Sequence, residues 1–418
     1  MTNKLPLGLY IHIPFCKSKC AYCDFYSMSG TNDDDMRRYT DALLLQMEDY
    51  SKAASAYRVD TVFIGGGTPT VLPVKCMADI INGIHRCFDV SKGAEFTMEA
   101  NPATISPSTL SKWRRAGVNR LSIGLQSANS DELSALSRIH TKTDFEASYL
   151  AARKAGYENI NVDIMFGIPF QTLESFNRTL DYVTSLEPEH ISMYGLKIED
   201  GTPFALSRDT LVLPDEDTEA DMYFDGIRYL EAKGFRHYEI SNFALPGYEC
   251  RHNLKYWNCD EYLGLGCAAH SYFRGLRFSF KRNMGLYCDA LEADISSGGM
   301  LTDDGISLTS EQYGATELID ELYTISPEER VGEYIMLRLR LSDGISSSRF
   351  RERFGLNFDA LYGRRLKVYI DNGFMTYDGD SYAFTPKGMY VSSYILSNIL
   401  DFDENSHIIT SIADGSDK

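Results

Sequence analysis

The sequence predicts an α/β protein whose first part is a partial (β/α)6 barrel of the TIM type and whose last part is a small winged-helix-like α+β domain. Two observations lead to this prediction. Six short runs rich in β-branched residues alternate with helix-like segments in the first half of the chain, and a repeat of roughly 30–40 residues is that of a strand–helix unit. Polar residues also follow several of these strands directly, at the edge where α/β barrels bind ligands.

Several of the predicted strands are apolar on both faces, which is typical of strands buried in a parallel sheet. The six runs are LGLYIHI from Leu7, VDTVFI from Val59, EFTMEA from Glu95, RLSIGL from Arg120, INVDIMF from Ile160 and HISMYGLKI from His190. Apolar residues recur at helical spacing between them. The helices predicted there span residues 36–56, 73–88, 107–116, 130–155 and 173–186. Right-handed crossovers would join such units into a parallel sheet.

The second half of the chain has a different pattern. We expect the barrel domain to span residues 1–240 and an aromatic and glycine-rich connecting region, without a clean period, to span 241–310. A C-terminal domain at 311–400 and an acidic tail at 401–418 complete the expected organisation. In the C-terminal domain, helices are predicted at 311–323, 327–341, 347–354, 358–372 and 388–400, with a hairpin at 377–382 whose turn is DGD.

Composition favours a cytoplasmic protein with a small-molecule ligand. The chain has 418 residues, 44% of them hydrophobic, which is enough for one large core and one smaller core. Its formal net charge of −18 disfavours general nucleic-acid binding, because phosphate contacts need a basic surface. It lacks a run of about 18 apolar residues that would span a membrane, and its start, MTNKLPLGLYIHIPF, lacks the features of a signal peptide. We therefore expect a cytoplasmic location.

Three cysteines lie within eight residues, directly after the first predicted strand. CKSKCAYC contains Cys16, Cys20 and Cys23, out of nine cysteines in the chain. In a reducing compartment such grouped thiols are more often metal ligands than disulfide partners. Three thiolates can hold three irons of a [4Fe–4S] cluster and leave the fourth iron open to a ligand. One alternative is that these are unrelated core cysteines. The other is a zinc site with His12 as its fourth ligand, although His12 lies on the preceding strand and its side chain should point away from the loop.

Further polar or glycine residues follow the other strands. These are the segment 65–70 after the second strand, Glu99 and Asn101 after the third, Gln126 after the fourth and Gly167 after the fifth. Because the carboxyl ends of barrel strands share one edge, we expect these residues to lie near the cysteines.

The CxxxCxxC loop resembles that of the radical S-adenosylmethionine superfamily. Seven motifs in order extend the resemblance to the group of anaerobic coproporphyrinogen oxidases and haem chaperones: YIHIPFCKSKCAYCDF, GGGTPT, EANP, RLSIGLQS, VDIMFGIP, YEISNFA and RHNLKYW. The match runs from Leu9 to about Tyr272, and more weakly to Thr385. It implies a radical S-adenosylmethionine barrel for 1–240 and a C-terminal domain of the HemN type for 311–400.

The resemblance also implies ligand contacts. Cys16, Cys20 and Cys23 would hold the [4Fe–4S] cluster. Arg138 would pair with the carboxylate of S-adenosylmethionine, and Asp163 would accept hydrogen bonds from its ribose. On their own, Arg138 and Asp163 would be interpreted as ordinary ion-pair residues and Glu99 as a solvated acid. The full set of expected S-adenosylmethionine contacts is Tyr10, Tyr22, Gly66, Gly67, Thr68, Glu99, Gln126, Arg138 and Asp163.

Two features favour the haem chaperone (HemW) branch. The first is a departure from the oxidases around the cysteine loop. The oxidases carry a fourth cysteine two residues after the third, whereas this chain has Asp24 and Phe25 there. The oxidases also have an extended N-terminal arm that helps to hold the substrate, whereas only 15 residues precede Cys16 here. The second feature is RHNLKYW (Arg251–Trp257), which resembles the HNxxYW motif that is associated with haem binding. His252 would be an axial ligand, with Tyr256 and Trp257 stacking on the macrocycle. A structural histidine is the alternative, and His270 and Cys250 are weaker candidates.

The region from 338 to 387 has nine Lys or Arg residues against six Asp or Glu residues. Such an excess suits DNA, haem propionates or anionic lipid, but a solvated face is the favoured interpretation.

The resemblance thus implies a protein that binds haem, a [4Fe–4S] cluster and S-adenosylmethionine and delivers haem to haemoproteins, such as membrane-bound respiratory enzymes. A homodimer is one expected assembly. The alternative is an oxygen-independent coproporphyrinogen III oxidase, which would use a 5′-deoxyadenosyl radical to decarboxylate two propionates. A zinc-bound structural protein is the hypothesis from a different class.

Overall fold

The computed structural model describes residues 4–102, 104–294, 301–302, 305–306 and 318–400. The chain forms two compact units. Unit 1 comprises Met1–Met222 and Glu261–Thr324, and unit 2 comprises Tyr223–Asp260 and Ile325–Lys418. The domain boundaries that we expect at residues 240, 310 and 400 stay predictions, and the tail at 401–418 lies outside the described residues.

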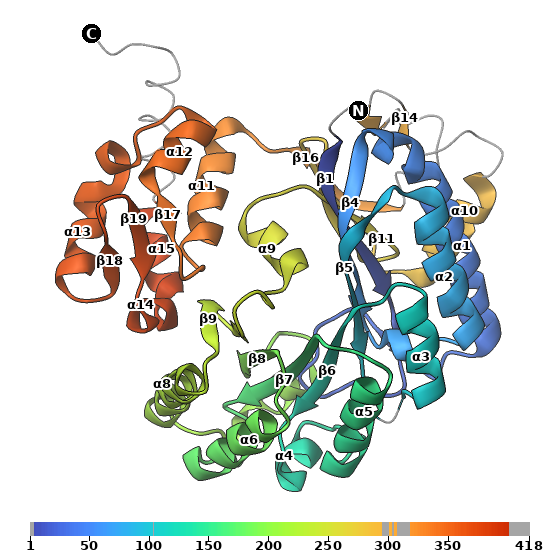
Figure 1. Ribbon diagram of the computed structural model, residues 1–418, viewed down its shortest axis with the longest axis horizontal. Helices are drawn as coiled ribbons and strands as arrows, with labels where there is room; N and C mark the ends of the chain where they lie inside the picture. The colour runs from blue at the N-terminus through green and yellow to red at the C-terminus, as the bar shows by residue number, and fades with distance from the viewer. Residues whose placement is uncertain (1–3, 103, 295–300, 303–304, 307–317, 401–418) are drawn as a thin grey trace. The chain divides into compact units, whose positions relative to one another are not determined.

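Seven parallel strands, in the order β11-β1-β4-β5-β6-β7-β8, form the main sheet of unit 1 (Figure 1). Six of them confirm the predicted strands. β6 is buried at every position, so its apolar run serves both faces of the sheet. The strands are β1 (Leu5–Ile13), β4 (Tyr57–Gly66), β5 (Val90–Ala100), β6 (Arg120–Gln126), β7 (Ile160–Phe166), β8 (His190–Gly195) and β11 (Tyr262–Leu265).

The helices of unit 1 connect successive strands, as the alternating pattern predicts, and lie along one side of the curved sheet (Figure 1). Local signals mark their starts. The side chains of Asn32, Ser106 and Thr172 accept a hydrogen bond from an amide of the first turn, which satisfies a donor that the helix leaves open. The helices are α1 (Asp33–Ala53), α2 (Val74–Cys87), α3 (Pro107–Arg115), α4 (Ser130–Ala135), α5 (Lys142–Lys154), α6 (Leu173–Ser185), α7 (Pro203–Leu206), α10 (Met284–Asp294) and α8 (Glu216–Ala232), which continues into unit 2.

The predicted helix 130–155 is wrong as a single element. It is two helices, α4 and α5, separated by residues 136–141. Ser137 has a positive φ of 58°, a left-handed conformation that ends a helix. Thr141 then starts α5 with a capping box. The break leaves Arg138 in the connection between the two helices rather than on a helix face.

The connecting region at 241–310 is also more regular than its sequence suggests. In unit 1 it contributes β11, β12 (His270–Phe273), β13 (Leu276–Phe280) and α10. β12 and β13 extend the sheet in an antiparallel sense beyond β11, and β16 (Ile319–Thr324) follows β13. The helix predicted at 311–323 is therefore wrong at 319–323, and its residues 311–317 lie outside the described ones. Short strands and turns complete unit 1: β2 (Phe15–Cys16), β3 (Met28–Ser29), β14 (Leu301–Thr302), β15 (Gly305–Ile306), η1 (Ala54–Ala56), η2 (Pro69–Val71) and η3 (Arg208–Thr210).

Unit 2 combines helices with a three-stranded antiparallel sheet in the order β17-β19-β18, the α+β order that the sequence predicts. The predicted hairpin is β18–β19, and the last predicted helix is two short ones, α14 and α15. The elements are β9 (Arg236–Glu239), β10 (Asn242–Ala244), α9 (Arg251–Trp257), α11 (Pro327–Arg338), β17 (Ile345–Ser346), α12 (Ser347–Phe354), the short π-helix η5 (Asp359–Gly363), α13 (Arg364–Asp371), β18 (Met375–Tyr377), β19 (Ser381–Phe384), α14 (Pro386–Tyr390) and α15 (Ser392–Ile399).

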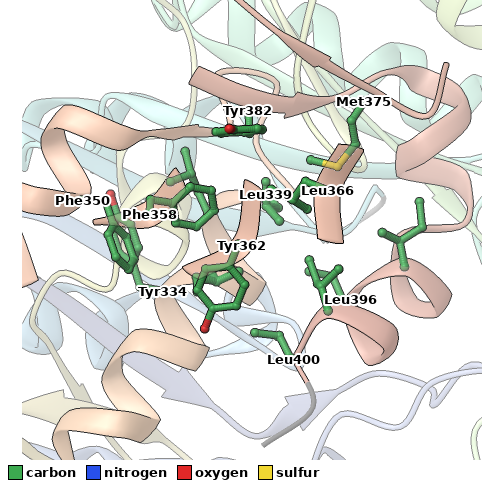
Figure 2. Packing of buried hydrophobic residues seen from close by; sticks show 14 of the residues in the cluster. Tyr334, Leu339, Phe350, Phe358, Tyr362, Leu366, Met375, Tyr382, Leu396 and Leu400 are labelled. Carbon is green, nitrogen blue, oxygen red and sulfur yellow. The ribbon is translucent and has the colours of Figure 1, made fainter. Parts of the chain in front are cut away.

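An aromatic core holds the C-terminal part of unit 2 together (Figure 2). Phe350 packs against Phe358 with ring centroids 5.0 Å apart, and Phe358 packs against Tyr362 at 5.2 Å and Tyr382 at 5.4 Å. These rings come from α12, η5 and β19 and the segment just before η5. Aromatic pairs at such distances add to the stabilisation from buried apolar area, so they tie the helices to the small sheet.

Within the described part of the chain, no helix combines the length and the apolar character needed to cross a membrane.

Candidate functional site

The cysteine loop, residues 16–23, is fixed by backbone contacts at its start and in its middle. β2, which ends at Cys16, pairs in parallel with β3. The amide of Cys23 donates to the carbonyl of Cys20 at 3.2 Å, so a turn brings these two residues together. Ala21 donates to the carbonyl of Leu136 at 3.4 Å, and its own carbonyl accepts from the amide of Phe204 at 3.0 Å. The loop is therefore held by segments that lie more than a hundred residues away.

A small apolar cluster supports these contacts. It consists of Ala21, Leu136, Met165, Ile168 and Phe204, with Tyr22 packed against it. An alanine between two thiols thus has a packing role that the spacing of the cysteines does not predict. Burial of this residue keeps the middle of the loop in place without using the thiols.

The three thiols are unpaired and partly exposed. Burial raises the pKa of Cys23, and the neighbouring thiols of Cys20 and Cys16 raise it further, because negative charges disfavour one another at short range. The three sulfur groups therefore share one small region. Among the described residues, no three His, Cys, Asp or Glu side chains converge in a way that would hold one metal ion.

The glycine segment at 65–67 serves the protein's own packing. The amide of Gly66 donates to Glu99 Oε2 at 3.1 Å, and the amide of Gly67 donates to the carbonyl of Ile13 at 2.8 Å. Gly66 has a φ of +109°, and a Cβ on Gly67 would lie 2.6 Å from the carbonyl oxygen of Phe15. Larger residues would therefore displace the backbone just before the first loop cysteine.

Thr68 continues this segment beside the loop. Its amide donates to the carbonyl of Phe15 at 2.7 Å, and its hydroxyl lies 3.5 Å from Cys16 Sγ. The amides of Gly66, Gly67 and Thr68 are thus all engaged inside the protein. Their carbonyl oxygens and the hydroxyl of Thr68 are the groups of this segment that could accept from an amino group of a ligand.

Two carboxylates lie close to each other in the sheet. Burial raises the pKa of Glu99 to about 8, and the nearby charge of Asp163 adds to this shift. Asp163 accepts from the amide nitrogen of Asn161 at 2.7 Å and from the hydroxyl of Ser122 at 3.2 Å. Glu99 therefore retains a proton at neutral pH and can donate it in a hydrogen bond.

Arg138 links the cysteine loop to the end of β6. Its Nη1 donates to Cys20 Sγ at 3.4 Å, and its Nη2 donates to the carbonyl of Gly124 at 3.1 Å and to Asn101 Oδ1 at 3.4 Å. Among the described residues its Nε finds no hydrogen-bond partner although it is buried. A Cβ on Gly124 would lie 2.8 Å from Gln126 Nε2 and 3.2 Å from Arg138 Nη2, so this glycine makes room for both side chains.

Tyr10 and His12 form a pair behind this region. The hydroxyl of Tyr10 lies 3.1 Å from His12 Nδ1, and His12 Nε2 lies 3.0 Å from the carbonyl oxygen of Tyr26. Burial lowers the pKa of His12 to about 4, so the ring is neutral. Both ring nitrogens thus have partners within the protein, and the expectation that this histidine points away from the loop stays a prediction. Burial also raises the pKa of Tyr10 and of Tyr22, so both hydroxyls stay protonated.

In unit 2, His252 lies in the first turn of α9 and is 1% exposed. Its Nε2 lies 2.9 Å from the hydroxyl of Tyr256, one turn further along the helix. Cys250 is fully buried, whereas His270, in unit 1, is exposed. The RHNLKYW motif therefore holds its histidine by an internal hydrogen bond. An imidazole with this partner would have to exchange it to bind iron.

Several cations of the basic region have structural partners. Arg338 Nη1 donates to Asn258 Oδ1 at 2.7 Å. Arg353 donates to the carbonyls of Asn258 and Cys259, at 3.1 and 2.9 Å. These two residues follow α9, whose last carbonyl groups lack partners within the helix. Part of the positive charge near 338–387 thus stabilises the end of α9.

Unit 1 therefore brings together most of the residues that the sequence singles out. Contacts join Cys16 to Thr68, Cys20 to Arg138, and Glu99 to Gly66. His252 belongs to unit 2. Sequence reasoning placed Asn101 at the ligand edge without a role, and it missed Ser122 and Asn161 as partners of Asp163. Asn161 lies two residues before Asp163 on β7, and Ser122 of β6 is in register with Asn161. The alternation of side chains along a strand was therefore the signal that could have found Asn161.

Comparison with known proteins decides the family. Residues 10–183 match the model of the radical SAM superfamily, and residues 325–391 match that of the HemN C-terminal domain. A Bacillus subtilis protein named heme chaperone HemW is 34% identical over 396 residues, which are 94% of this chain and 98% of that protein. The chain belongs to the HemW family. Its Escherichia coli relative of the same name is 41% identical over 270 residues, which cover 65% of this chain and 71% of that protein.

A solved structure shows the same fold. The coproporphyrinogen III oxidase HemN from Escherichia coli, described as a radical SAM enzyme, superimposes with a TM-score of 0.80, covering 96% of this chain and 91% of that one at 22% identity. The similarity confirms the predicted α/β fold with its C-terminal domain.

The residues of this HemW-family chain fit the cofactors that the superfamily implies, a [4Fe–4S] cluster and S-adenosylmethionine. Ligands of one zinc ion converge within about 2.3 Å of it, whereas thiolates of a four-iron cluster each bind a different iron. Three free thiols in one region suit the second arrangement. The buried, unpartnered Nε of Arg138, next to Cys20, offers a donor for an anionic group beside the cluster.

Proposed function

We propose that this protein binds haem, carries a [4Fe–4S] cluster with S-adenosylmethionine, and delivers haem to recipient haemoproteins. The observation that carries the proposal is the similarity to a protein named heme chaperone HemW over nearly the full length of both chains. The loop supports it as well. Asp24 follows the third cysteine, and the exposed Phe25 stands where the oxidases carry a fourth cysteine.

In this proposal Cys16, Cys20 and Cys23 hold three irons. When bound, the cluster supplies an open iron for the amino and carboxylate groups of S-adenosylmethionine and an electron for its sulfonium. Arg138 pairs with the carboxylate of the cofactor, because its guanidinium is already fixed beside Cys20. The carbonyl oxygens of Gly66 and Gly67 accept from the amino group, because a backbone carbonyl accepts hydrogen bonds whereas an amide N–H only donates them.

The other proposed contacts hold the nucleoside. Asp163 accepts from the ribose hydroxyls. Glu99, which keeps a proton at neutral pH, donates to the cofactor. Gln126 contributes an amide from the end of β6, and Tyr10 and the backbone of Tyr22 pack beside the sulfonium and the adenine.

For haem, we propose that His252 is the axial ligand after it exchanges its hydrogen bond with Tyr256. Titration of the apo-protein with haem tests this. Saturable binding with a shifted Soret band is expected for the wild type and for His85→Ala, which changes an exposed histidine and serves as the control. His252→Ala should lose the shift, and Tyr256→Phe should tighten binding because it removes the hydroxyl that Nε2 would otherwise have to exchange for the iron. An unchanged Soret band in His252→Ala would reject this ligand, and a wild type without saturable binding would reject the function.

Protein reconstituted anaerobically with its cluster distinguishes the chaperone from the oxidase. An anaerobic assay with coproporphyrinogen III, S-adenosylmethionine and a reductant should yield no protoporphyrinogen. Formation of that product in catalytic amounts would replace the chaperone proposal. Delivery is tested by mixing the haem-loaded protein with membrane vesicles that contain a haem-free respiratory enzyme, and transfer should depend on His252. A cytoplasmic location, a homodimer and the absence of nucleic-acid binding stay predictions.

A further inference from the structure

A buried polar network lies beneath Asp163 on one face of three neighbouring strands. Ser122 of β6 is paired in register with Asn161 of β7, and Asn161 with His190 of β8. Asp163 and Ser192 lie two residues further along their strands, so their side chains share that face. Apart from Asp163, each of these residues is at most 6% exposed.

Asn161 uses all of its hydrogen-bonding capacity in this network. Its Nδ2 donates to Asp163 Oδ1 at 2.7 Å and to Ser122 Oγ at 2.8 Å. Its Oδ1 accepts from His190 Nδ1 at 2.6 Å and from Ser192 Oγ at 3.1 Å. A side-chain amide has two donors and two acceptor sites, so this one is fully satisfied.

The carboxylate of Asp163 determines the direction of every bond in the network. A carboxylate only accepts, so the amino end of Asn161 must face it and the carbonyl end must face His190. Burial lowers the pKa of His190 well below its ordinary value, so the ring is neutral and carries its one proton on Nδ1. Ser122 accepts from Asn161 and therefore spends its single hydroxyl proton on Asp163 Oδ2, at 3.2 Å.

We propose that Asn161, fixed by His190 and Ser192, is a positioning residue that orients the Asp163 carboxylate toward the ribose hydroxyls of S-adenosylmethionine. This inference rests on the proposed function, in which Asp163 contacts the ribose. Asn161 donates to Oδ1 of Asp163 and Ser122 donates to Oδ2. The remaining lone pairs of both oxygens can accept from the ligand. The carboxylate thereby keeps one rotamer, and binding does not have to order it.

A double-mutant cycle on the affinity for S-adenosylmethionine, measured by equilibrium dialysis with the anaerobically reconstituted protein, tests the proposal. Asp163→Asn and Asn161→Ala should each weaken binding about tenfold, the effect of one lost hydrogen bond to a charged group. The double variant should bind no more weakly than Asp163→Asn alone, because Asn161 acts through Asp163. Ser148→Ala is the control, since that buried hydroxyl donates to the carbonyl of Asp144 in its own helix.

The outcomes distinguish the positioning role of Asn161 from the ligand contact of Asp163. Additive losses in the double variant would overturn the role of Asn161 while leaving Asp163 in the site. An unchanged affinity in Asp163→Asn would remove Asp163 from the site and contradict the proposed function at that residue.

Asn161→Asp gives a second readout that a purely structural role would not change. It places two carboxylates side by side, which must share a proton to coexist. Affinity relative to the wild type at the same pH should therefore fall as the pH rises from about 6 to 8. A ratio that stays constant with pH would overturn the proposal. The comparison with the wild type at the same pH accounts for the other ionisable groups that act on this region, which are Glu99, Tyr22, His190, Arg120 and Arg138.

Discussion

Arg138 joins three parts of the proposed site, and its geometry demands a guanidinium. It donates to Cys20 Sγ, to Asn101 and to the carbonyl of Gly124 at the same time. An ammonium is a single point charge and cannot span these partners. We therefore predict that Arg138→Lys weakens S-adenosylmethionine binding about tenfold and leaves the iron and sulfide content unchanged. Equilibrium dialysis and iron analysis measure both quantities.

Arg114, which is partly exposed, provides a matched control. It donates to the carbonyl of Gly156, so Arg114→Lys makes the same chemical change away from the loop. Equal affinities in Arg138→Lys and Arg114→Lys would show that the guanidinium of Arg138 has no part in binding the cofactor.

Glu239 makes stability depend on pH. It is fully buried, and burial raises its pKa to about 7 from an ordinary value of 4.5. Between these values the folded state keeps a proton that the unfolded state releases, so the free energy of unfolding falls as the pH rises from 4.5 to 7. The loss amounts to about 3 kcal/mol at about 1.36 kcal/mol per unit. A glutamine at position 239 cannot titrate. We therefore predict that the free energy of unfolding of Glu239→Gln increases relative to that of the wild type from pH 4.5 to 7, and that the difference is constant above pH 7.

Urea unfolding at several pH values measures this difference. The neighbouring His237, whose pKa burial lowers to about 4, has the opposite effect. Because of His237, the free energy of unfolding rises with pH between 4 and 6.5 in both the variant and the wild type. The difference between the two proteins therefore reports on Glu239 alone. The exposed Glu231, changed to Gln, is the control. Parallel pH curves for wild type and Glu239→Gln would refute the prediction.

At the residue scale, the sequence predicts the identity of the functional side chains better than it predicts the contacts that fix their positions. The spacing of Cys16, Cys20 and Cys23 identifies the thiols because three ligands on one loop have a local pattern. The contacts of Arg138 depend on a helix break and on a glycine in another strand, neither of which is local to it. Burial of His252 depends on packing, so the motif alone could not predict that its Nε2 bonds Tyr256.

At the scale of elements, the end of β4 sets the position of the cysteine loop. A Cβ on Gly67 would lie 2.6 Å from the carbonyl oxygen of Phe15 and 2.9 Å from that of Ile13, and backbone atoms cannot move aside independently. We predict that Gly67→Ala shifts the chain before Cys16 and at least halves the iron and sulfide bound after anaerobic reconstitution. In Gly93→Ala, the new Cβ would have open space around it, so this variant should bind the full amount. A full cluster content in Gly67→Ala would contradict this account.

The six strands could be predicted because burial on both faces leaves continuous apolar runs, as in β6. The predicted helix 130–155 is wrong because the apolar spacing continues through the break, while the left-handed turn at Ser137 has no glycine to mark it. β11 to β13 were missed for another reason. Glycines and aromatic residues disguise the short strands, and their pairing with distant segments stabilises them.

At the scale of the whole molecule, the order of the chain differs from the order of the fold. β11 pairs with β1 although more than 240 residues separate Gly8 from Tyr262. The chain leaves unit 1 after Met222, returns at Glu261 and leaves again after Thr324. A sequence pattern describes neighbours along the chain, so it could predict the barrel units but not this return.

The excess of negative charge makes a prediction for the whole chain. With 59 acidic and 41 basic residues, folding gathers like charges and their repulsion opposes it. Salt shortens the Debye length from about 30 Å at 0.01 M to about 8 Å at 0.15 M. Salt also weakens surface ion pairs such as Arg38 with Glu292, but each of these contributes at most about 1 kcal/mol. We therefore predict that the unfolding temperature rises by roughly 1–3 °C over this range of sodium chloride.

Scanning calorimetry at two pH values provides the control within the same protein. Near the isoelectric point of about 4.9 the net charge is close to zero. Salt then has little net repulsion to screen, and its main effect is to weaken surface ion pairs. The salt effect should then disappear or change sign. Choline chloride in place of sodium chloride should give the same rise at pH 7, because screening depends on ionic strength rather than on the cation. An unfolding temperature that falls with salt at pH 7 would mean that ion pairs outweigh the net charge.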